Sequence, residues 1–234
     1  MLEEQKERAL SKVTMIQLGK DAEGRKSFLL LTDEAQRSLA LWYDIEKRYD
    51  IDYAIAGRYR SLYGAFQRIF DEFSLCIHQA IIEDYTEATL SIKRRNIQKD
   101  FRMHAADAAF LAYRAEAPIY FIEDFIAEMA IKDEKGELLN PKAAYQKAVS
   151  SGFLCQLVER EGVLEAIRPE GFSFVTCQTN YAKHVYVPPS HIRRFGLKEG
   201  NEMHILARGP YGSECYYTLV LTKTVNGKEP VPVT

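Results

Sequence analysis

The spacing of apolar residues changes near Gly162, and this change restricts the fold more than any other feature of the chain. Before that point, apolar residues recur mostly at intervals of three and four, as on one face of a helix. After it, they form short runs separated by Gly and Pro, as in strands joined by turns. The two patterns predict an α+β protein with a mainly helical domain over residues 1–131, a linker over 132–161 and a β-barrel domain over 162–234.

The longest regular pattern in the N-terminal region steps by four and three residues. It would place an apolar stripe on one face of a long helix, which must then be buried against another helix. Aromatic side chains and nearby glycines favour a helical bundle within the chain, and a coiled coil between two chains is the alternative. Either arrangement suits protein contact or self-association. The stripe consists of Ile55, Tyr59, Leu62, Phe66, Ile69, Phe73, Cys76 and Ala80.

Shorter patterns extend this interpretation of the N-terminal domain. Two apolar runs flanking a polar loop predict a β-hairpin near the start of the chain. Thr32 is a candidate N-cap, because two acidic residues follow it where the helix dipole favours negative charge. The hairpin covers residues 13–18 and 27–31, and helices are predicted over 32–49, 105–117 and 119–131.

A run of cations stands out in residues 93–102, which hold five Lys or Arg and one Asp. Helical spacing continues through the run, so we expect it on a helix. A solvated helix face is the favoured interpretation, because such runs commonly keep a surface hydrated. A contact with nucleic acid or with an acidic partner is the alternative.

Composition limits the classes of function. Lys plus Arg total 31 and Asp plus Glu total 33, and a net charge of −2 argues against indiscriminate binding of polyanions. The sequence has no apolar run of membrane-spanning length and no secretory signal pattern, so we expect a cytoplasmic location without membrane contact. The spacing of the four Cys and five His suits neither a metal site nor a disulfide framework. We also expect no cofactor and no enzymatic activity, because no nucleophile or paired acid-base motif is present.

The C-terminal region has five short apolar runs in about 70 residues, which predicts a small barrel of the OB type. Phe172 and Phe174 lie two residues apart and therefore share one face of a strand. They could be core residues, or an exposed platform on which bases stack. Gly171 favours the platform, because a residue without a side chain lets a ligand backbone approach closely. The residues that could fill the core instead are Val163, Ile167, Val175, Val185 and Val187. The strands are expected over residues 162–168, 171–176, 185–187, 202–207 and 216–225, with a short helix near 190–195.

Three segments occur here in a specific order. They are Gly162-Val163-Leu164-Glu165, then Gly171-Phe172-Ser173-Phe174, then the run from Val185 to Gly200 that contains Ile192-Arg193-Arg194-Phe195. With the later Gly209-Pro210-Tyr211-Gly212-Ser213-Glu214, they resemble the RNA-binding domain of the bacterial transcription termination factor Rho. That domain is a cold-shock-like OB fold, and the resemblance covers roughly residues 160–232.

The resemblance implies a set of nucleic-acid-binding positions. Phe172 and Phe174 match rings that stack on a pyrimidine-rich single strand. An aromatic-walled pocket for the next base matches Tyr186, Glu214 and Tyr216, and a neighbouring apolar contact matches Ile167. Three polar positions of the family differ, because Thr176, His184 and Cys215 replace Arg, Asp and Arg. Loss of these groups implies stacking without strict preference for cytosine.

The sequence lacks the G-x-x-x-x-G-K-[ST] phosphate loop that the Rho motor uses. We therefore expect an adaptor or regulator that binds single-stranded nucleic acid, with RNA favoured over DNA, and that does not itself move along it. A role in transcription follows from the resemblance. The alternative is a protein-interaction scaffold whose barrel no longer binds nucleic acid, since a fold does not fix its function.

Overall fold

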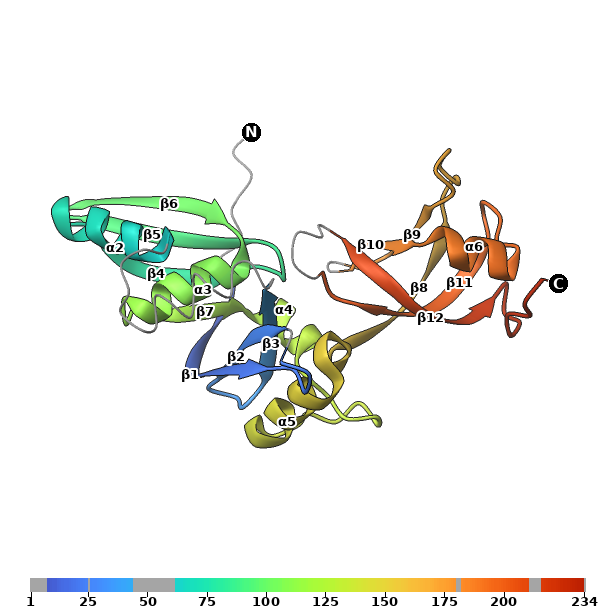
Figure 1. Ribbon diagram of the computed structural model, residues 1–234, viewed down its shortest axis with the longest axis horizontal. Coiled ribbons are helices and arrows are strands. Elements are labelled where there is room, and N and C mark those ends of the chain that lie inside the picture. Colours follow the sequence, from blue (N-terminus) through green and yellow to red (C-terminus); the bar gives the residue numbers. More distant parts are fainter. Residues whose placement is uncertain (1–7, 25, 44–61, 180–181, 211–215, 234) are drawn as a thin grey trace. The chain divides into compact units, whose positions relative to one another are not determined.

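The computed structural model describes residues 8–24, 26–43, 62–179, 182–210 and 216–233. The chain divides into two compact units, Met1–Cys155 and Gln156–Thr234, which are described separately (Figure 1). Residues 132–161, for which the sequence predicted a linker, hold helix α5 (Pro141–Ser151), the 3-10 helix η1 (Gly152–Cys155) and the first residues of strand β8 (Leu157–Leu164).

The first unit is built on a seven-stranded sheet, so the prediction of a mainly helical N-terminal domain was wrong. The strand order is β3-β2-β1-β7-β4-β5-β6, with β7 and β4 parallel and the other pairs antiparallel. The strands are β1 (Leu10–Lys20), β2 (Ser27–Asp33), β3 (Ser38–Tyr43), β4 (Cys76–Ile82), β5 (Ala88–Arg94), β6 (Ile97–Met103) and β7 (Ile119–Ile122). In the part of the chain that the structure describes, the helices preceding α5 are α2 (Leu62–Glu72), α3 (Ala105–Arg114) and α4 (Glu123–Met129).

The predicted hairpin is confirmed by the pairing of β1 with β2, but the helix predicted over residues 32–49 was wrong. Every residue of β2 and of β3 is buried, so neither strand shows the alternation that identifies a half-exposed strand. Thr32-Asp33-Glu34 leads into a hairpin turn instead of capping a helix. Asp33 Oδ1 accepts a hydrogen bond from the backbone N–H of Arg37 at 2.8 Å. Residues 44–49 lie outside the described residues.

The apolar stripe does not form one continuous helical seam, because it passes from helix α2 into strand β4, and the predicted helical bundle is not supported. Helix α2 ends at Glu72, and Ser74 adopts a positive φ of 49° before the chain enters β4. Phe70 of α2 is buried, whereas Ile69 of the stripe is 47% exposed. Cys76 and Ala80 belong to β4, and the stripe positions Ile55 and Tyr59 lie outside the described residues.

Two further helical predictions were also wrong in part. Residues 93–102 form the end of β5, a tight turn and most of β6, because Lys93 pairs with Gln98 and Arg94 with Ile97. The segment 119–131 begins as strand β7 and becomes helical only at Glu123. The alanine-rich segment is helical as predicted, over Ala105–Arg114.

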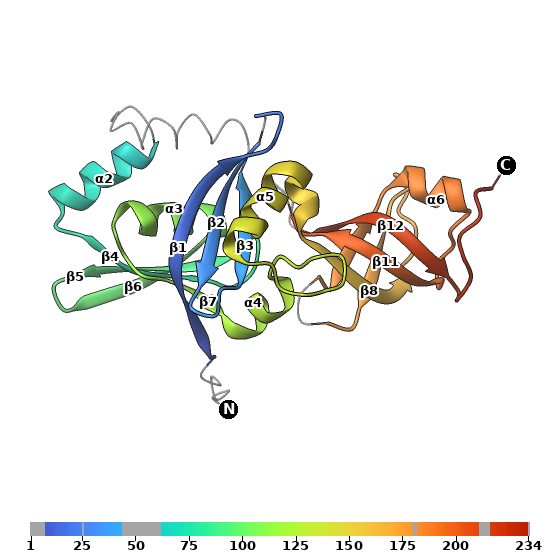
Figure 2. The ribbon, with the colours of Figure 1, turned by 90° about the horizontal axis from the view of Figure 1, so that it is seen from below.

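Helix α3 packs against strands β4 and β5 through its small side chains (Figures 1 and 2). Ala105, Ala108, Ala109 and Ala112 are completely buried, and Phe110 between them is completely buried as well. Alanine allows a helix to lie close to a sheet and loses no side-chain entropy on burial. The alanine-rich composition therefore serves helix-on-sheet packing, in place of the helix-on-helix packing that we expected.

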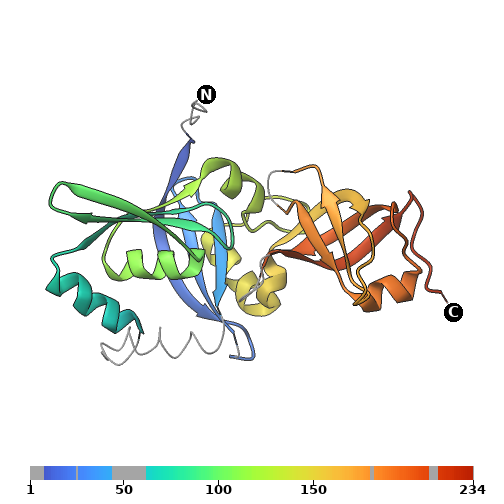
Figure 3. The same cartoon turned by 90° about the horizontal axis from the view of Figure 1, so that it is seen from above.

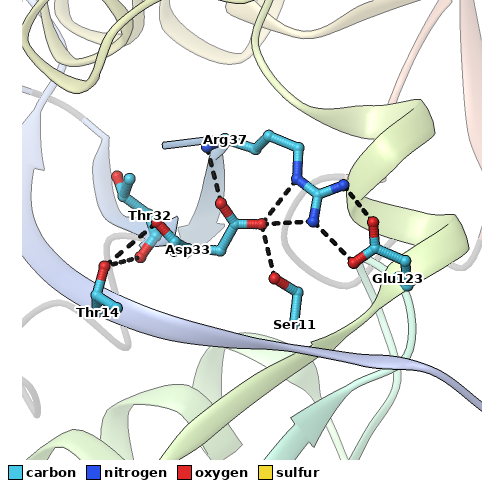
Figure 4. A network of polar contacts seen from close by, with 6 residues as sticks. All are labelled: Ser11, Thr14, Thr32, Asp33, Arg37 and Glu123. Carbon is cyan, nitrogen blue, oxygen red and sulfur yellow. Dashed lines mark hydrogen bonds and ion pairs between the residues drawn. The ribbon is translucent and has the colours of Figure 1, made fainter. Parts of the chain in front are cut away.

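A buried carboxylate joins three elements of this unit (Figure 4). The side chain of Asp33 has no exposed surface, and it accepts hydrogen bonds from Ser11 Oγ at 2.9 Å and from Arg37 Nε at 2.8 Å. The guanidinium of Arg37 also donates to both carboxylate oxygens of Glu123, at 2.5 and 2.8 Å. The hydrogen bond from Arg37 lowers the pKa of Glu123. Arg37 therefore connects the β2–β3 turn and strand β1 to the start of α4.

The second unit is a closed five-stranded barrel, as the sequence predicted. Its strand order is β10-β12-β11-β8-β9, and only β10 and β12 pair in parallel within it. The elements after β8 are β9 (Ser173–Cys177), β10 (His184–Val187), the short helix α6 (Pro189–Phe195), β11 (Glu202–Arg208) and β12 (Tyr217–Val225). Figure 3 shows the same barrel from above.

The core of the barrel matches the expectation only in part. Val175, Val185 and Val187 are completely buried, but Val163 and Ile167 are 47% and 40% exposed. Gly162 lies where β8 crosses β9, and a Cβ atom on it would come within 2.4 Å of the backbone oxygen of Thr176. The barrel therefore closes at a position that only glycine can occupy.

None of the helices in the described ranges is long and apolar enough to cross a membrane.

The cysteines of the first unit are expected to differ in reactivity. Cys76 is exposed, whereas Cys155 is buried and its burial raises the pKa of the thiol to about 12. Since the thiolate is the reactive form, iodoacetamide at pH 8 should modify Cys76 and leave Cys155 intact in the folded protein. Peptide mass spectrometry before and after unfolding in urea measures this difference. Equal modification of the two thiols in the folded protein would contradict the packing described here.

Candidate nucleic-acid interface

Four aromatic side chains gather on the outside of the barrel, and we call Phe172, Phe174, Tyr186 and Tyr216 the ring cluster. In β9, Ser173 and Val175 are completely buried, so Phe174 between them points outward. Tyr186 alternates with buried neighbours in β10 in the same way and pairs with Phe174 across the two strands. Of the two interpretations of Phe172 and Phe174, the barrel core is therefore excluded for Phe174.

Phe174 contacts each of the other three rings of the ring cluster, as Tyr186 does. Its ring centroid lies 5.8 Å from that of Phe172, 5.9 Å from Tyr186 and 5.4 Å from Tyr216. All three contacts are edge-to-face, with interplanar angles of 66° to 90°. Tyr216 is 37% exposed, and the other three rings are partly exposed. The rings thus form one continuous aromatic surface open to solvent.

Tyr186 and Tyr216 stack on each other, with centroids 5.3 Å apart and planes inclined by 29°. A base held between two rings needs about 7 Å between them, because each van der Waals contact takes about 3.5 Å. The space between the two tyrosines is therefore closed. A base can stack on an outer face of the cluster, or it must first separate this pair.

A polar cluster lies beside the rings on the same face of β9 and β10. Thr176 and His184 pair across the two strands, one step along from Phe174 and Tyr186. The hydroxyl of Thr176 donates to Glu165, and His184 Nδ1 lies 3.5 Å from Glu165 Oε1. We did not select Glu165 from the sequence. Its position directly after β8, in phase with the exposed Val163, was the available signal.

The remaining predicted positions divide into three groups. Ile167 is 40% exposed and available to a ligand. Glu214 and Cys215 lie outside the described residues. Gly171, which we expected to allow a ligand backbone to approach, has a φ of +86°, and its N–H donates to the carbonyl of Arg168 at 2.8 Å. Its conformation shows that the turn before Phe172 requires glycine, whatever the ligand.

An acidic groove of about 670 Å³ borders the polar cluster at Thr176 and runs over β8 and β11. Glu159, Glu161 and Glu202 contribute carboxylates to its lining, and Arg160 and His204 are its basic residues, so acids outnumber Arg by three to one. Glu159 lies 2.5 Å from both Lys223 Nζ and His204 Nε2, and the hydrogen bond from Lys223 lowers its pKa. Fixed carboxylates disfavour phosphate, so this groove is unsuited to the backbone of a nucleic acid.

Comparison with known proteins agrees with this geometry. Residues 160–231 match the family described as Rho termination factor, RNA-binding domain. The chain is 40% identical over 77 residues to transcription termination factor Rho of Bacillus subtilis and 42% identical over 81 residues to that of Aquifex aeolicus. It is 32% identical over 112 residues to the Rho of Neisseria gonorrhoeae.

These matches cover 32%, 33% and 46% of this chain, and 18%, 18% and 25% of the respective relatives. The chain therefore spans about a fifth of the length of the curated relatives that it matches. The resemblance to the Rho RNA-binding domain, which the sequence motifs indicated, is shown for residues 160–231.

Proposed function

We propose that this chain binds single-stranded nucleic acid, with RNA favoured over DNA, through the ring cluster of its barrel. The observation that carries the proposal is the outward aromatic surface of Phe172, Phe174, Tyr186 and Tyr216, whose ring centroids lie 5.3 to 5.9 Å apart. It lies within the residues that match an RNA-binding family.

Stacking supplies most of the affinity in this proposal, because each base on an aromatic ring contributes about 1–3 kcal/mol. Glu165 can accept a hydrogen bond from the amino group of a stacked base, and the proposal gives Glu214 the same role. Residues 151–234 hold nine Lys or Arg and eight Asp or Glu, a net charge of +1. Few phosphate contacts then form on the barrel, so its binding should depend only weakly on salt.

The proposal assigns binding and not catalysis to these residues. The 234 residues contain no phosphate-loop motif, so ATP-driven movement is not part of it. The relatives are transcription termination factors, which supports a regulatory role on RNA during transcription in the cytoplasm. The first unit would serve as the adaptor part, through protein contact or self-association.

A protein-interaction scaffold is the second candidate, and one observation favours it. Tyr186 and Tyr216 close on each other, and Thr176 and His184 stand where the Rho family has charged groups. A barrel of this kind could present its rings to a protein instead of to bases. The scaffold predicts no measurable binding of oligonucleotides even at low salt.

Titration with labelled oligonucleotides tests the proposal. A fluorescein-labelled pyrimidine 10-mer of RNA should bind at least about tenfold more tightly than the same sequence in a duplex, because paired bases cannot splay onto the rings. Fluorescence anisotropy at 50 mM salt measures both affinities, and the DNA 10-mer measures the preference for RNA. Absence of binding to every single strand would favour the scaffold, and equal affinity for the duplex would reject stacking.

A further inference from the structure

The hairpin formed by β5 and β6 concentrates positive charge, and we call its residues 88–103 the basic hairpin. It carries Lys93, Arg94, Arg95, Lys99 and Arg102, against the single acid Asp100. The whole chain has a net charge of −2, so this segment of +4 is opposite in sign to the rest. The barrel proposal does not use it.

Strand register and exposure make these cations available. Every residue from Ile97 to Arg102 in β6 is exposed, and β6 is the last strand in the sheet order (Figure 1). Within the described residues, Arg102 forms an ion pair with Glu87 at 3.5 Å, and the other four cations of the hairpin have none. Both partners of that pair are more than half exposed, so it is weak.

Protection of a sheet edge explains only part of this charge. Charged side chains on an edge strand discourage pairing with another chain, which accounts for Lys99 and Arg102 in β6. Lys93 and Arg94 lie in β5, which pairs with β6 and with β4 and is therefore not an edge. Arg95 lies in the turn. Three of the five cations thus need another explanation.

The turn residue Arg95 has a φ of 53°, in the left-handed region that favours glycine, so an arginine there costs conformational energy that glycine would avoid. Tight hairpin turns require such a conformation, so the turn geometry accounts for it. The position also offers a useful variant, because Arg95→Gly removes the charge and relieves the turn.

Exposed apolar side chains accompany the cations. Ile97 is 65% exposed and Phe101 is 46% exposed, and both share with Lys99 one face of β6. Cations beside a solvent-exposed ring suit a nucleic acid, whose phosphates bind the cations and whose bases stack on the ring. An acidic protein would satisfy the cations but offers no general partner for the exposed ring.

We propose that the basic hairpin is a second nucleic-acid contact, separate from the ring cluster. Arg94, Arg95 and Lys99 hold the phosphate backbone, and Phe101, on the same face as Arg94 and Lys99, contacts a base. This contact goes beyond the proposed function of the barrel and does not depend on it. A single strand and a duplex both present the phosphates, and the experiment distinguishes them.

The test removes three charges in two matched ways. The hairpin variant is Arg94→Gln/Arg95→Gly/Lys99→Gln, and the control variant is Arg114→Gln/Lys135→Gln/Lys142→Gln, which removes three exposed cations elsewhere in the same unit. A labelled single-stranded 30-mer RNA and a 30-base-pair duplex are titrated at 0.1 to 0.3 M salt. Circular dichroism and thermal unfolding check that both variants fold.

The slope of log affinity against log salt should fall by about 2 for the single strand, or by about 3 if the duplex is the ligand, in the hairpin variant alone. If the slope changes by 2, the ratio of the unsubstituted protein's affinity for the single strand to that of the hairpin variant falls about ninefold between 0.1 and 0.3 M salt. The control variant should keep the original slope. Equal slopes and affinities for the two variants with both probes would overturn the proposal.

Repeating the titrations with Phe172→Ala and Phe174→Ala present separates the two proposals. If the hairpin substitutions still reduce the salt dependence of binding in that background, the basic hairpin contacts nucleic acid even if the ring cluster binds nothing. An acidic protein partner is tested with a labelled Glu 20-mer. Hairpin-dependent binding of this peptide, without any hairpin-dependent binding of either nucleic acid, would overturn the proposal.

Discussion

Changing Phe172 and Phe174 together to Ala is expected to weaken the binding of single-stranded RNA at least about thirtyfold. Each base that stacks on a ring contributes about 1–3 kcal/mol, so two lost rings remove about 2 kcal/mol at the lower limit. Phe174 contacts the other three rings of the cluster, and its loss also disorders the surface that remains. Anisotropy titration of a pyrimidine RNA 10-mer at 50 mM salt measures the loss of affinity.

Two substitutions with opposite chemistry separate stacking from simple apolar contact. Phe172→Leu/Phe174→Leu keeps apolar volume but removes the flat faces, and it should lose most of the affinity. Phe172→Tyr/Phe174→Tyr keeps the faces and should retain binding. Leu221→Ala, at a residue of the barrel that is 51% exposed and outside the ring cluster, is the control for folding. Binding that survives the Leu pair would contradict a stacking platform.

The second large effect concerns the stability of the first unit. Arg37→Met should lower the free energy of unfolding by about 3–5 kcal/mol, because it leaves a buried carboxylate without its charged partner. The Asp33 side chain has no exposed surface, and only Ser11 Oγ and a backbone N–H would continue to donate to it. Urea unfolding followed by circular dichroism measures the loss.

Two further variants test whether the unpaired buried charge causes the loss of stability in Arg37→Met. Glu123→Gln should cost less than about 1 kcal/mol, since the Glu123 side chain is 40% exposed and water replaces the lost contact. Asp33→Asn combined with Arg37→Met should recover much of the stability lost in Arg37→Met alone, because no buried charge remains. A double variant as unstable as Arg37→Met alone would show that shape, and not charge, holds this network together.

The same network makes the stability of the first unit depend on pH. Arg37 lowers the pKa of Glu123 in the folded protein below its ordinary value of 4.5. The contribution of Glu123 to stability is therefore present above pH 4.5 and is lost as the pH falls through the lowered value. Arg37→Met should remove this part of the acid sensitivity.

The barrel was predictable because its short strands are separated by Gly and Pro and because β9 and β10 alternate between core and surface. That alternation predicts from the sequence that Phe172 and Phe174 share one face. Glu165 was not found, because its contact with Thr176 depends on where β8 lies beside β9. The spacing of residues in the sequence does not show which residues of β8 and β9 pair.

Part of the first unit was wrongly predicted to be helical because strands β2 and β3 lack an exposed face. An apolar run such as β2, buried at every residue, has no alternation that distinguishes it from a buried helix segment. The step from Phe73 to Cys76 fits helical spacing, although the chain turns at Ser74 and continues as a strand. Local spacing cannot show that β4 pairs with β7, whose residues lie about 40 positions later.

Strand β1 has a consequence for how the protein is made. Its first residues pair with β7, where Leu10 lies opposite Ile122, and its later residues pair with β2. The meander of the first three strands can assemble early during translation. The β1 edge of this meander has no partner until residues 119–122 have left the ribosome, so a nascent chain carries an unfinished sheet through about 75 residues of synthesis after Tyr43.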